Sequence, residues 1–204
     1  MKITIIDYKS GNTKSVLFAL QRLGFDAIIT DNPEEITSSD KVIIPGVGEA
    51  SSAMKSLKEK NLDDVILSLN QPVLGICLGM QLMCRQTEEG QSSTHKETQG
   101  LGIFRVNVKK FKTPADQPEL KVPQMGWNSI AKLKGPLFKD VPENAHVYYV
   151  HGYYAELDAY TSAVTDYIQP YSAALSYENF HGVQFHPEKS GVAGEFILRN
   201  FLNL

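Results

Sequence analysis

The chain has few cysteines, little excess charge and no long apolar run. Two cysteines among 204 residues, Cys77 and Cys84, are too few for a secreted disulfide framework and are typical of a reducing cytoplasm. A formal net charge of −3 gives no general attraction to nucleic acid or anionic lipid. No segment approaches the roughly 20 apolar residues of a membrane-spanning helix, and the first residues lack the apolar region of a signal peptide. We therefore expect a cytoplasmic protein whose two thiols, Cys77 and Cys84, are reduced.

What is present is an ordinary globular composition, with 42% hydrophobic and 21% charged residues. The length lies just above the usual size of one domain, about 100–200 residues. A chain of this size buries a sizeable core without disulfides or a structural metal. We expect one domain over residues 1–204.

The first half of the sequence alternates short apolar runs with segments of helical periodicity. Val16, Leu20 and Leu23 recur at helical spacing before Gly24, and residues 50–57 repeat the pattern. Strands separated by helices predict a parallel sheet that is covered on both faces. The expected strands are residues 2–7, 26–30, 41–44 and 72–77, and a further helix is expected from residue 80 onward.

The second half changes character after a polar segment, residues 88–100, that reads as a surface loop. Runs rich in Val, Tyr, Phe and Ile follow, separated by turn residues, and a helix is expected at residues 193–204. The predicted fold class is α/β: a single-domain, open, mostly parallel sheet flanked by helices, with antiparallel strands added in the second half. The expected added strands are residues 104–111, 147–154, 163–168 and 173–185.

One cysteine lies in a special local pattern. Gly75, Cys77 and Gly79 form a glycine-x-cysteine-x-glycine segment where a strand is expected to turn into a helix. This spacing is typical of a nucleophile elbow, in which glycines on both sides allow a strained turn that exposes the nucleophile. The alternative is a small buried residue at the end of a core strand. For Cys84, in an apolar helical segment, we expect only a packing role.

A thiolate nucleophile needs a group that transfers protons and a second group that orients it. His186 follows an apolar strand, and Glu188 lies two residues further on, so in extended backbone its side chain would reach the imidazole. The alternative is a surface His-Pro-Glu turn. His95, His146 and His181 have no evident partner in the sequence.

Together, the segment around Cys77 and the Phe-His-Pro-Glu segment of residues 185–188 resemble the class I glutamine amidotransferase family. The resemblance implies a Cys77–His186–Glu188 triad that hydrolyses L-glutamine to glutamate and ammonia without metal or other cofactor. It also implies an oxyanion hole built from backbone N–H groups of Val47, in the Pro-Gly-Val-Gly segment of residues 45–48, and of Leu78. The implied glutamine-binding residues are Gly48, Gln81, His151, Gly152 and Tyr153.

Within that family, further segments are similar to the glutaminase subunits of imidazole glycerol phosphate synthases. They are residues 7–12, 123–128, 149–153 and 184–190. One departure is Gly152, where some relatives have Thr, so a substrate contact there must come from backbone. The resemblance implies a heterodimer with a cyclase subunit built as a (β/α)₈ barrel. The implied docking residues are Asn12, Met125, Gly126, Trp127 and Asn128.

Three other functions remain open at this stage. A cysteine peptidase or γ-glutamyl hydrolase would use the same elbow but gives no role to Gln81 or to residues 125–128. A non-catalytic binding module would be expected to have lost a member of the triad. A stand-alone glutaminase would release ammonia without a partner.

Overall fold

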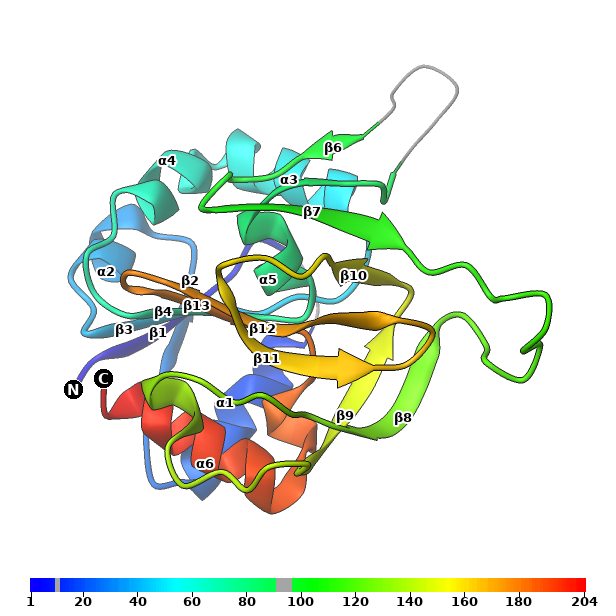
Figure 1. Ribbon diagram of the computed structural model, residues 1–204. Coiled ribbons are helices and arrows are strands. Elements are labelled where there is room, and N and C mark those ends of the chain that lie inside the picture. The colour runs from blue at the N-terminus through cyan, green and yellow to red at the C-terminus, as the bar shows by residue number, and fades with distance from the viewer. Residues whose placement is uncertain (10–11, 91–96) are drawn as a thin grey trace.

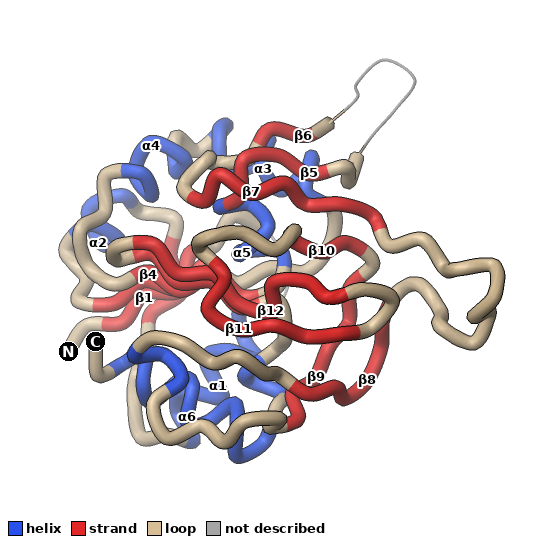
Figure 2. The backbone as a smooth tube through the Cα atoms, viewed as in Figure 1, coloured by secondary structure: helices blue, strands red, loops and turns tan. Residues whose placement is uncertain are grey.

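One long sheet organises the molecule, and the computed structural model describes residues 1–9, 12–90 and 97–204 (Figures 1 and 2). The strand order is β2-β1-β3-β4-β13-β12-β10-β7-β5-β6, and β11 pairs with β12 at the side of this path. The strands of this sheet are β1 (Ile3–Ile6), β2 (Ile28–Thr30), β3 (Lys41–Ile44), β4 (Val73–Ile76), β5 (Cys84–Thr87), β6 (Thr98–Gln99), β7 (Phe104–Lys110), β10 (Tyr153–Ala155), β11 (Thr161–Asp166), β12 (Pro170–Tyr177) and β13 (Phe180–Val183).

The predicted parallel half of the sheet is confirmed. β1 pairs in parallel with β2 and β3, and β3 pairs in parallel with β4. On its other side β4 pairs in parallel with β13, in a register that sets Ile76 opposite Val183. The carboxyl ends of β4 and β13 therefore lie next to each other, although the two strands are far apart in the sequence.

The second half contains expected antiparallel strands, but two predicted strands are each divided into two. Residues 173–185 do not form one strand: the chain reverses at Glu178, where φ is 51°, and β12 and β13 form an antiparallel hairpin. The reversal needs a residue in the left-handed region of φ and ψ, which is usually Gly or Asn. The sequence Tyr-Glu-Asn of residues 177–179 puts a glutamate there, so it did not indicate a turn. Not every late pairing is antiparallel, since β5 also pairs in parallel with β7.

The predicted strand over residues 147–154 is also divided. It consists of β9 (His146–His151) and β10, which belong to different sheets and are separated by Gly152. β9 pairs with β8 (Gln124–Ser129) in a separate two-stranded antiparallel ribbon, in which Trp127 lies opposite Tyr148. The segment around Trp127 that reads as turn-like in sequence is thus a strand.

Helices cover both faces of the sheet, as predicted, and alternate strand residues divide the core into two clusters (Figure 1). Ile43 and Leu74 point toward the cluster containing α1 and α6, and Val42 and Val73 point toward the opposite one. The helices are α1 (Thr13–Arg22), α2 (Pro33–Thr37), α3 (Ala50–Glu59), α4 (Leu62–Leu67), α5 (Leu78–Met83) and α6 (Gly191–Leu202), with short 3₁₀ turns η1 (Pro136–Phe138) and η2 (Pro187–Lys189).

Several expectations about local structure need correction. α5 ends at Met83, so Cys84 begins β5 rather than lying within a helix, although it is fully buried as expected of a packing residue. α2, α4, β5 and β6 were not foreseen, since each is short. His95, and residues 10 and 11 of the segment 7–12, lie outside the described residues.

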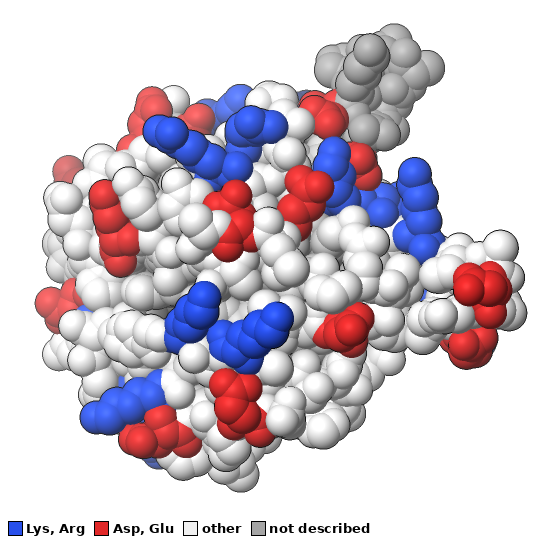
Figure 3. All heavy atoms as spheres, in the orientation of Figure 1, with Lys and Arg blue, Asp and Glu red and all other residues white. Residues whose placement is uncertain are grey.

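The surface agrees with the small net charge. On the face drawn in Figure 3, basic and acidic side chains are interspersed among the described residues rather than gathered into large areas of one sign. Within the same described ranges, no helix is long and apolar enough to cross a membrane.

The short helix α5 lies unusually close to the sheet, because Gly79 has no side chain. A Cβ atom at Gly79 would lie 2.0 Å from the carbonyl oxygen of Ile44 in β3, far inside van der Waals contact. A Cβ at Gly152 would meet nothing nearer than 3.7 Å, the Cγ1 atom of Val122. Gly79 is therefore required for packing, and Gly152 is not.

We predict that Gly79→Ala lowers the free energy of unfolding by about 3 kcal/mol or more, because the added methyl group displaces α5 from β3. The matched change Gly152→Ala should lower it by less than about 1 kcal/mol. Urea denaturation of both variants measures the difference. Equal stability of the two would contradict the close approach of α5.

Candidate active site

Cys77 occupies the strained turn that the glycine spacing predicts. It follows β4 directly and has φ 53° and ψ −108°, a conformation that is rare for a residue with a side chain. Its backbone N–H donates to the Val183 carbonyl of β13 at 2.8 Å. A Cβ at Gly75 would lie 2.8 Å from the backbone of Gly79, so both flanking glycines are needed for the turn.

His186 and Glu188 reach the same edge of the sheet through β13. His186 lies three residues beyond Val183, the partner of Ile76, and this short distance brings it to Cys77. Nδ1 of His186 lies 2.8 Å from Oε1 of Glu188, and both side chains are fully buried. The structure thus brings Cys77, His186 and Glu188 together.

The backbone reason for the His186–Glu188 contact differs from the expected one. His186 is extended, but Pro187–Lys189 forms the 3₁₀ turn η2, so the two residues do not share one face of a strand. The backbone of His186 is also fixed, because its N–H donates to the Tyr148 carbonyl of β9 at 2.9 Å. The contact was predictable, whereas the turn was not.

Asn12 is part of this cluster, although the sequence resemblance assigns it only to docking. Its side-chain amide donates to Oε1 of Glu188 at 2.6 Å, so this oxygen accepts from both Asn12 and His186. Asn12 itself is half-buried and has φ 80°, just before α1 begins. It lies between the buried carboxylate and the protein surface.

The electrostatics of the cluster favour a charged imidazole. Burial lowers the pKa of His186, but the nearby Cys77 sulfur and the Glu188 carboxylate bonded to Nδ1 favour the charged ring and raise the pKa well above its ordinary value. The Glu188 carboxylate accepts from Nδ1, which leaves Nε2 to exchange protons. Nε2 has no hydrogen-bond partner among the described residues.

A cavity of about 290 Å³ opens beside Cys77. Its wall brings together the loop after β3, the first turn of α5 and the junction between β9 and β10. It is lined by Val47, Gly48, Cys77, Leu78, Gln81, Glu89, Pro123, Val150, His151, Gly152 and Tyr153. All seven residues expected in the oxyanion hole and the glutamine site are among them.

Side-chain amides connect the cavity wall to the sulfur. Gln81 Nε2 donates to the Tyr153 carbonyl at 3.1 Å and to Oε1 of Gln184 at 2.9 Å. Nε2 of Gln184 lies 3.6 Å from the Cys77 sulfur. In the sequence Gln184 stands out only as the first residue of the segment 184–190, and nothing in its strand-like context indicates that it touches the nucleophile.

His151 is buried in its neutral form at the same wall. Its Nδ1 lies 2.7 Å from the Tyr153 carbonyl and its Nε2 lies 3.3 Å from the hydroxyl of Tyr171, which donates to Gln124. Burial lowers the pKa of His151 to about 4, since little in its surroundings stabilises a positive charge.

The cavity also contains residues that the sequence did not single out. Glu89, Pro123 and Val150 contribute to the lining, and Glu89 is the carboxylate among the lining residues. Burial raises the pKa of Glu89, while its Oε2 accepts from the Ala50 N–H at 2.9 Å. Glu89 lies in the polar segment that read as a plain surface loop, so no local signal marked it.

The β8–β9 ribbon has two different sides. Gln124 is buried, while Met125 and Trp127 are 66% and 56% exposed, as expected for alternate residues of a strand. The Trp127 ring packs edge-on against Tyr148. Gly191, the first residue of α6, lies close to the Trp127 ring, and the residue after it, Val192, is 70% exposed. Met125 lies opposite Val150 in the ribbon and Trp127 lies opposite Tyr148, so these exposed residues share a face with Val150, which lines the cavity. The predicted docking residues Met125 and Trp127 thus present apolar surface next to the cavity.

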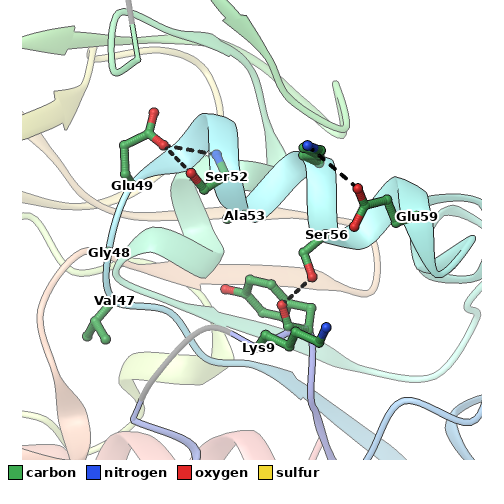
Figure 4. A pocket seen from close by; sticks show the side chains of 10 residues that line it. Lys9, Val47, Gly48, Glu49, Ser52, Ala53, Ser56 and Glu59 are labelled. Atoms are coloured by element: carbon green, nitrogen blue, oxygen red, sulfur yellow. Dashed lines mark hydrogen bonds and ion pairs between the residues drawn. The ribbon is translucent and has the colours of Figure 1, made fainter.

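A second hollow of about 420 Å³ lies on the other side of the loop after β3 (Figure 4). It shares Val47 and Gly48 with the first cavity and is otherwise lined by α3 with its capping residue Glu49 and by Tyr8 and Lys9, which follow β1; Cys77 is not among its lining residues. Glu49 begins α3 here: burial raises its pKa, but hydrogen bonds from Ser51 and Ser52 outweigh burial and hold the pKa at about 2.

The family model described as glutamine amidotransferase class-I matches residues 4–204. The chain belongs to this family. The family prediction is thereby confirmed over almost the whole chain. Among solved structures, a glutamine amidotransferase from Thermotoga maritima has a TM-score of 0.64 at 17% identity, covering 100% of this chain and 96% of that chain. This amidotransferase structure supports the fold alone.

Two amidotransferase relatives are much more similar in sequence. A Bacteroides fragilis protein named imidazole glycerol phosphate synthase subunit HisH is 53% identical over 204 residues, which is 100% of both chains. A Bacteroides thetaiotaomicron protein of the same name is 52% identical, also over 100% of both chains. The resemblance found in the motifs thus extends over the full length.

We predict that the buried neutral His151 makes stability depend on pH. Its folded pKa of about 4 lies below the unfolded value near 6.5, so its contribution is complete above about pH 6.5 and is lost as the pH falls toward 4. The free energy of unfolding should fall by about 3 kcal/mol over this interval. In His151→Gln this part of the dependence should disappear.

The matched control is His146→Gln, because His146 begins the same strand but is exposed. Its urea denaturation midpoints should follow the wild-type pH dependence. A His151→Gln protein that loses stability between pH 6.5 and 4 as steeply as the wild type would contradict the burial of a neutral imidazole.

Proposed function

We propose that this chain is the glutaminase subunit of an imidazole glycerol phosphate synthase. It hydrolyses L-glutamine and passes the ammonia to a cyclase subunit that makes imidazole glycerol phosphate and aminoimidazole carboxamide ribotide in histidine biosynthesis. The observation that carries the proposal is the strained Cys77 beside the buried His186–Glu188 pair, in the wall of a cavity of about 290 Å³. The names of the relatives at 52–53% identity support the particular synthase.

In the proposed mechanism the Cys77 thiolate attacks the side-chain amide carbon of glutamine. The C–N bond breaks as His186 gives its proton to the leaving nitrogen, which departs as ammonia and leaves a γ-glutamyl thioester. His186 then takes a proton from the water that attacks the thioester, and glutamate leaves as the thiolate is restored. Glu188 holds the ring through Nδ1 and stabilises its charged form.

The tetrahedral intermediates carry an oxyanion, for which we propose the backbone N–H groups of Val47 and Leu78. Both residues line the cavity on either side of Cys77. Leu78 is the first residue of α5, where the helix does not use its own N–H groups. One such donor is typically worth about 3–4 kcal/mol of transition-state stabilisation.

For the substrate we propose contacts with backbone at Gly48 and residues 151–153, with Gln81 behind them. Free glutamine carries an ammonium and a carboxylate group besides its amide. Glu89 supplies a negative charge on the wall of the cavity and is proposed to accept from the ammonium group. Such a contact favours free glutamine over a peptide, in which that nitrogen is uncharged.

The partner is proposed to dock on the outward side of the β8–β9 ribbon, through Met125 to Asn128, and near Asn12. This surface adjoins the cavity, because Met125 lies opposite the lining residue Val150, so ammonia released at Cys77 has a short way to the interface. We further propose that residues 1–204 act as one domain in the cytoplasm, where Cys77 stays reduced. Both cysteines are free thiols.

The first test measures glutamate release with and without a cyclase subunit and its nucleotide substrate. The wild-type chain should be slow alone and stimulated by the loaded partner, while Cys77→Ala should lose at least about 10³-fold in both conditions. Cys84→Ala is the matched control and should keep turnover. Turnover by Cys77→Ala would exclude the thioester mechanism, and a fast rate indifferent to the partner would indicate a stand-alone glutaminase.

The second test concerns docking. Trp127→Ala should weaken cyclase binding by about tenfold to a hundredfold, because exposed tryptophans at interfaces contribute much of the binding free energy. Tyr177→Ala is the matched control: Tyr177 is 42% exposed but lies in the β12–β13 hairpin, at the sheet edge opposite Cys77. Isothermal titration calorimetry that finds equal loss in both variants would place the interface elsewhere.

A further inference from the structure

Gln184 is a fully buried side chain for which the proposed mechanism has no role. It follows β13, two residues before His186, and its Nε2 lies 3.6 Å from the Cys77 sulfur, within hydrogen-bonding range for sulfur. A buried amide is costly unless its polar atoms are paired. The direction of the hydrogen bonds around Gln184 therefore carries information about the sulfur.

The direction is fixed from the Tyr153 carbonyl, which can only accept. Gln81 must turn its amino group toward this oxygen, at 3.1 Å, and the same nitrogen lies 2.9 Å from Gln184. Since Gln81 is the donor, Gln184 must present its oxygen, Oε1, to Gln81. The amino group of Gln184 is thereby turned toward Cys77.

His151 holds the starting point of this chain in place. Its Nδ1 lies 2.7 Å from the same Tyr153 carbonyl, so this oxygen has two neighbouring donor nitrogens, from His151 and Gln81. The tautomer follows from the carbonyl being an acceptor only: Nδ1 carries the proton. The chain of donors then runs in one direction from the cavity wall to the sulfur, which is left as an acceptor.

We infer that Gln184 is a positioning residue that donates a hydrogen bond to the Cys77 thiolate and keeps the sulfur aimed into the cavity. A thiolate only accepts hydrogen bonds, whereas a thiol also has a proton to place, so a fixed donor favours the thiolate. The inference rests on the proposed function for the use of Cys77 as a nucleophile. The geometry on which it depends does not involve glutamine.

The test therefore measures the sulfur directly, by alkylation of Cys77 with iodoacetamide from about pH 5 to about pH 10, read by fragment-ion mass spectrometry. In Gln184→Met, which fills the space without a donor, the rate at about pH 7 should fall about tenfold and the half-maximal pH should rise by about one unit. A merely structural role of Gln184 would lower stability without moving this pH profile.

The matched control is Gln124→Met, the same change at another buried glutamine, whose Oε1 accepts from Tyr171 and which has no contact with Cys77. Its alkylation profile should coincide with that of the wild type. If Gln184→Met does not fold, Gln184→Glu decides, since it keeps the size of the side chain and replaces the amino donor by a carboxylate. Its half-maximal pH should also rise.

A folded Gln184 variant with the wild-type pH profile would overturn the inference. That result is distinct from failure of the proposed function, which would show as glutamine turnover that survives Cys77→Ala. A shifted profile without any glutaminase activity would keep the role of Gln184 and remove the proposed reaction.

Discussion

The parallel pairing of β4 with β13 is the constraint on which the rest of the site depends. It sets Ile76 opposite Val183, so the residues that follow the two strands meet at one edge of the sheet. The hydrogen bond from Cys77 N–H to the Val183 carbonyl continues this pairing into the elbow. Without this pairing, nothing would bring the thiol of Cys77 and the imidazole of His186 close together in space. The strained backbone of Cys77 is kept in its conformation by the close packing of Gly75 and Gly79, and the core on both faces of the sheet keeps those glycines in place.

The chemistry of the site was more predictable from the sequence than its architecture. The elbow was predictable from the spacing of Gly75, Cys77 and Gly79, because a Cβ atom at either glycine would clash with the backbone that packs against it. Glu188 was paired with His186 correctly, but through an assumed extended backbone where η2 exists. Local pattern gives the identity of the reactive groups. It does not give the turn that presents them, since that is decided by hydrogen bonds to β9 and to Ser190.

Other features were hidden because their determinants are not local. The reversal at Glu178 and the break at Gly152 interrupt runs that look continuous in composition, and β8 pairs with a strand that begins 17 residues after β8 ends (146 − 129). Gln184 and Glu89 have ordinary sequence surroundings, and their importance comes from what the fold places beside them. The alternating pattern of the first half, in contrast, predicted the parallel strands well, because β1, β3 and β4 are short, apolar and buried along their whole length.

The β8–β9 ribbon limits how the surface of the protein can be redesigned. The main chain of Tyr148 holds His186, Val150 and His151 line the cavity, and Met125 and Trp127 face outward from the paired strand. Since Met125 lies opposite Val150, the face of the ribbon that carries the exposed apolar residues also reaches the cavity. An engineer who repacks this face to accept a new protein shifts part of the cavity lining as well. New partner specificity is therefore best sought on α6, beginning at Val192, which borders the ribbon without lining the cavity.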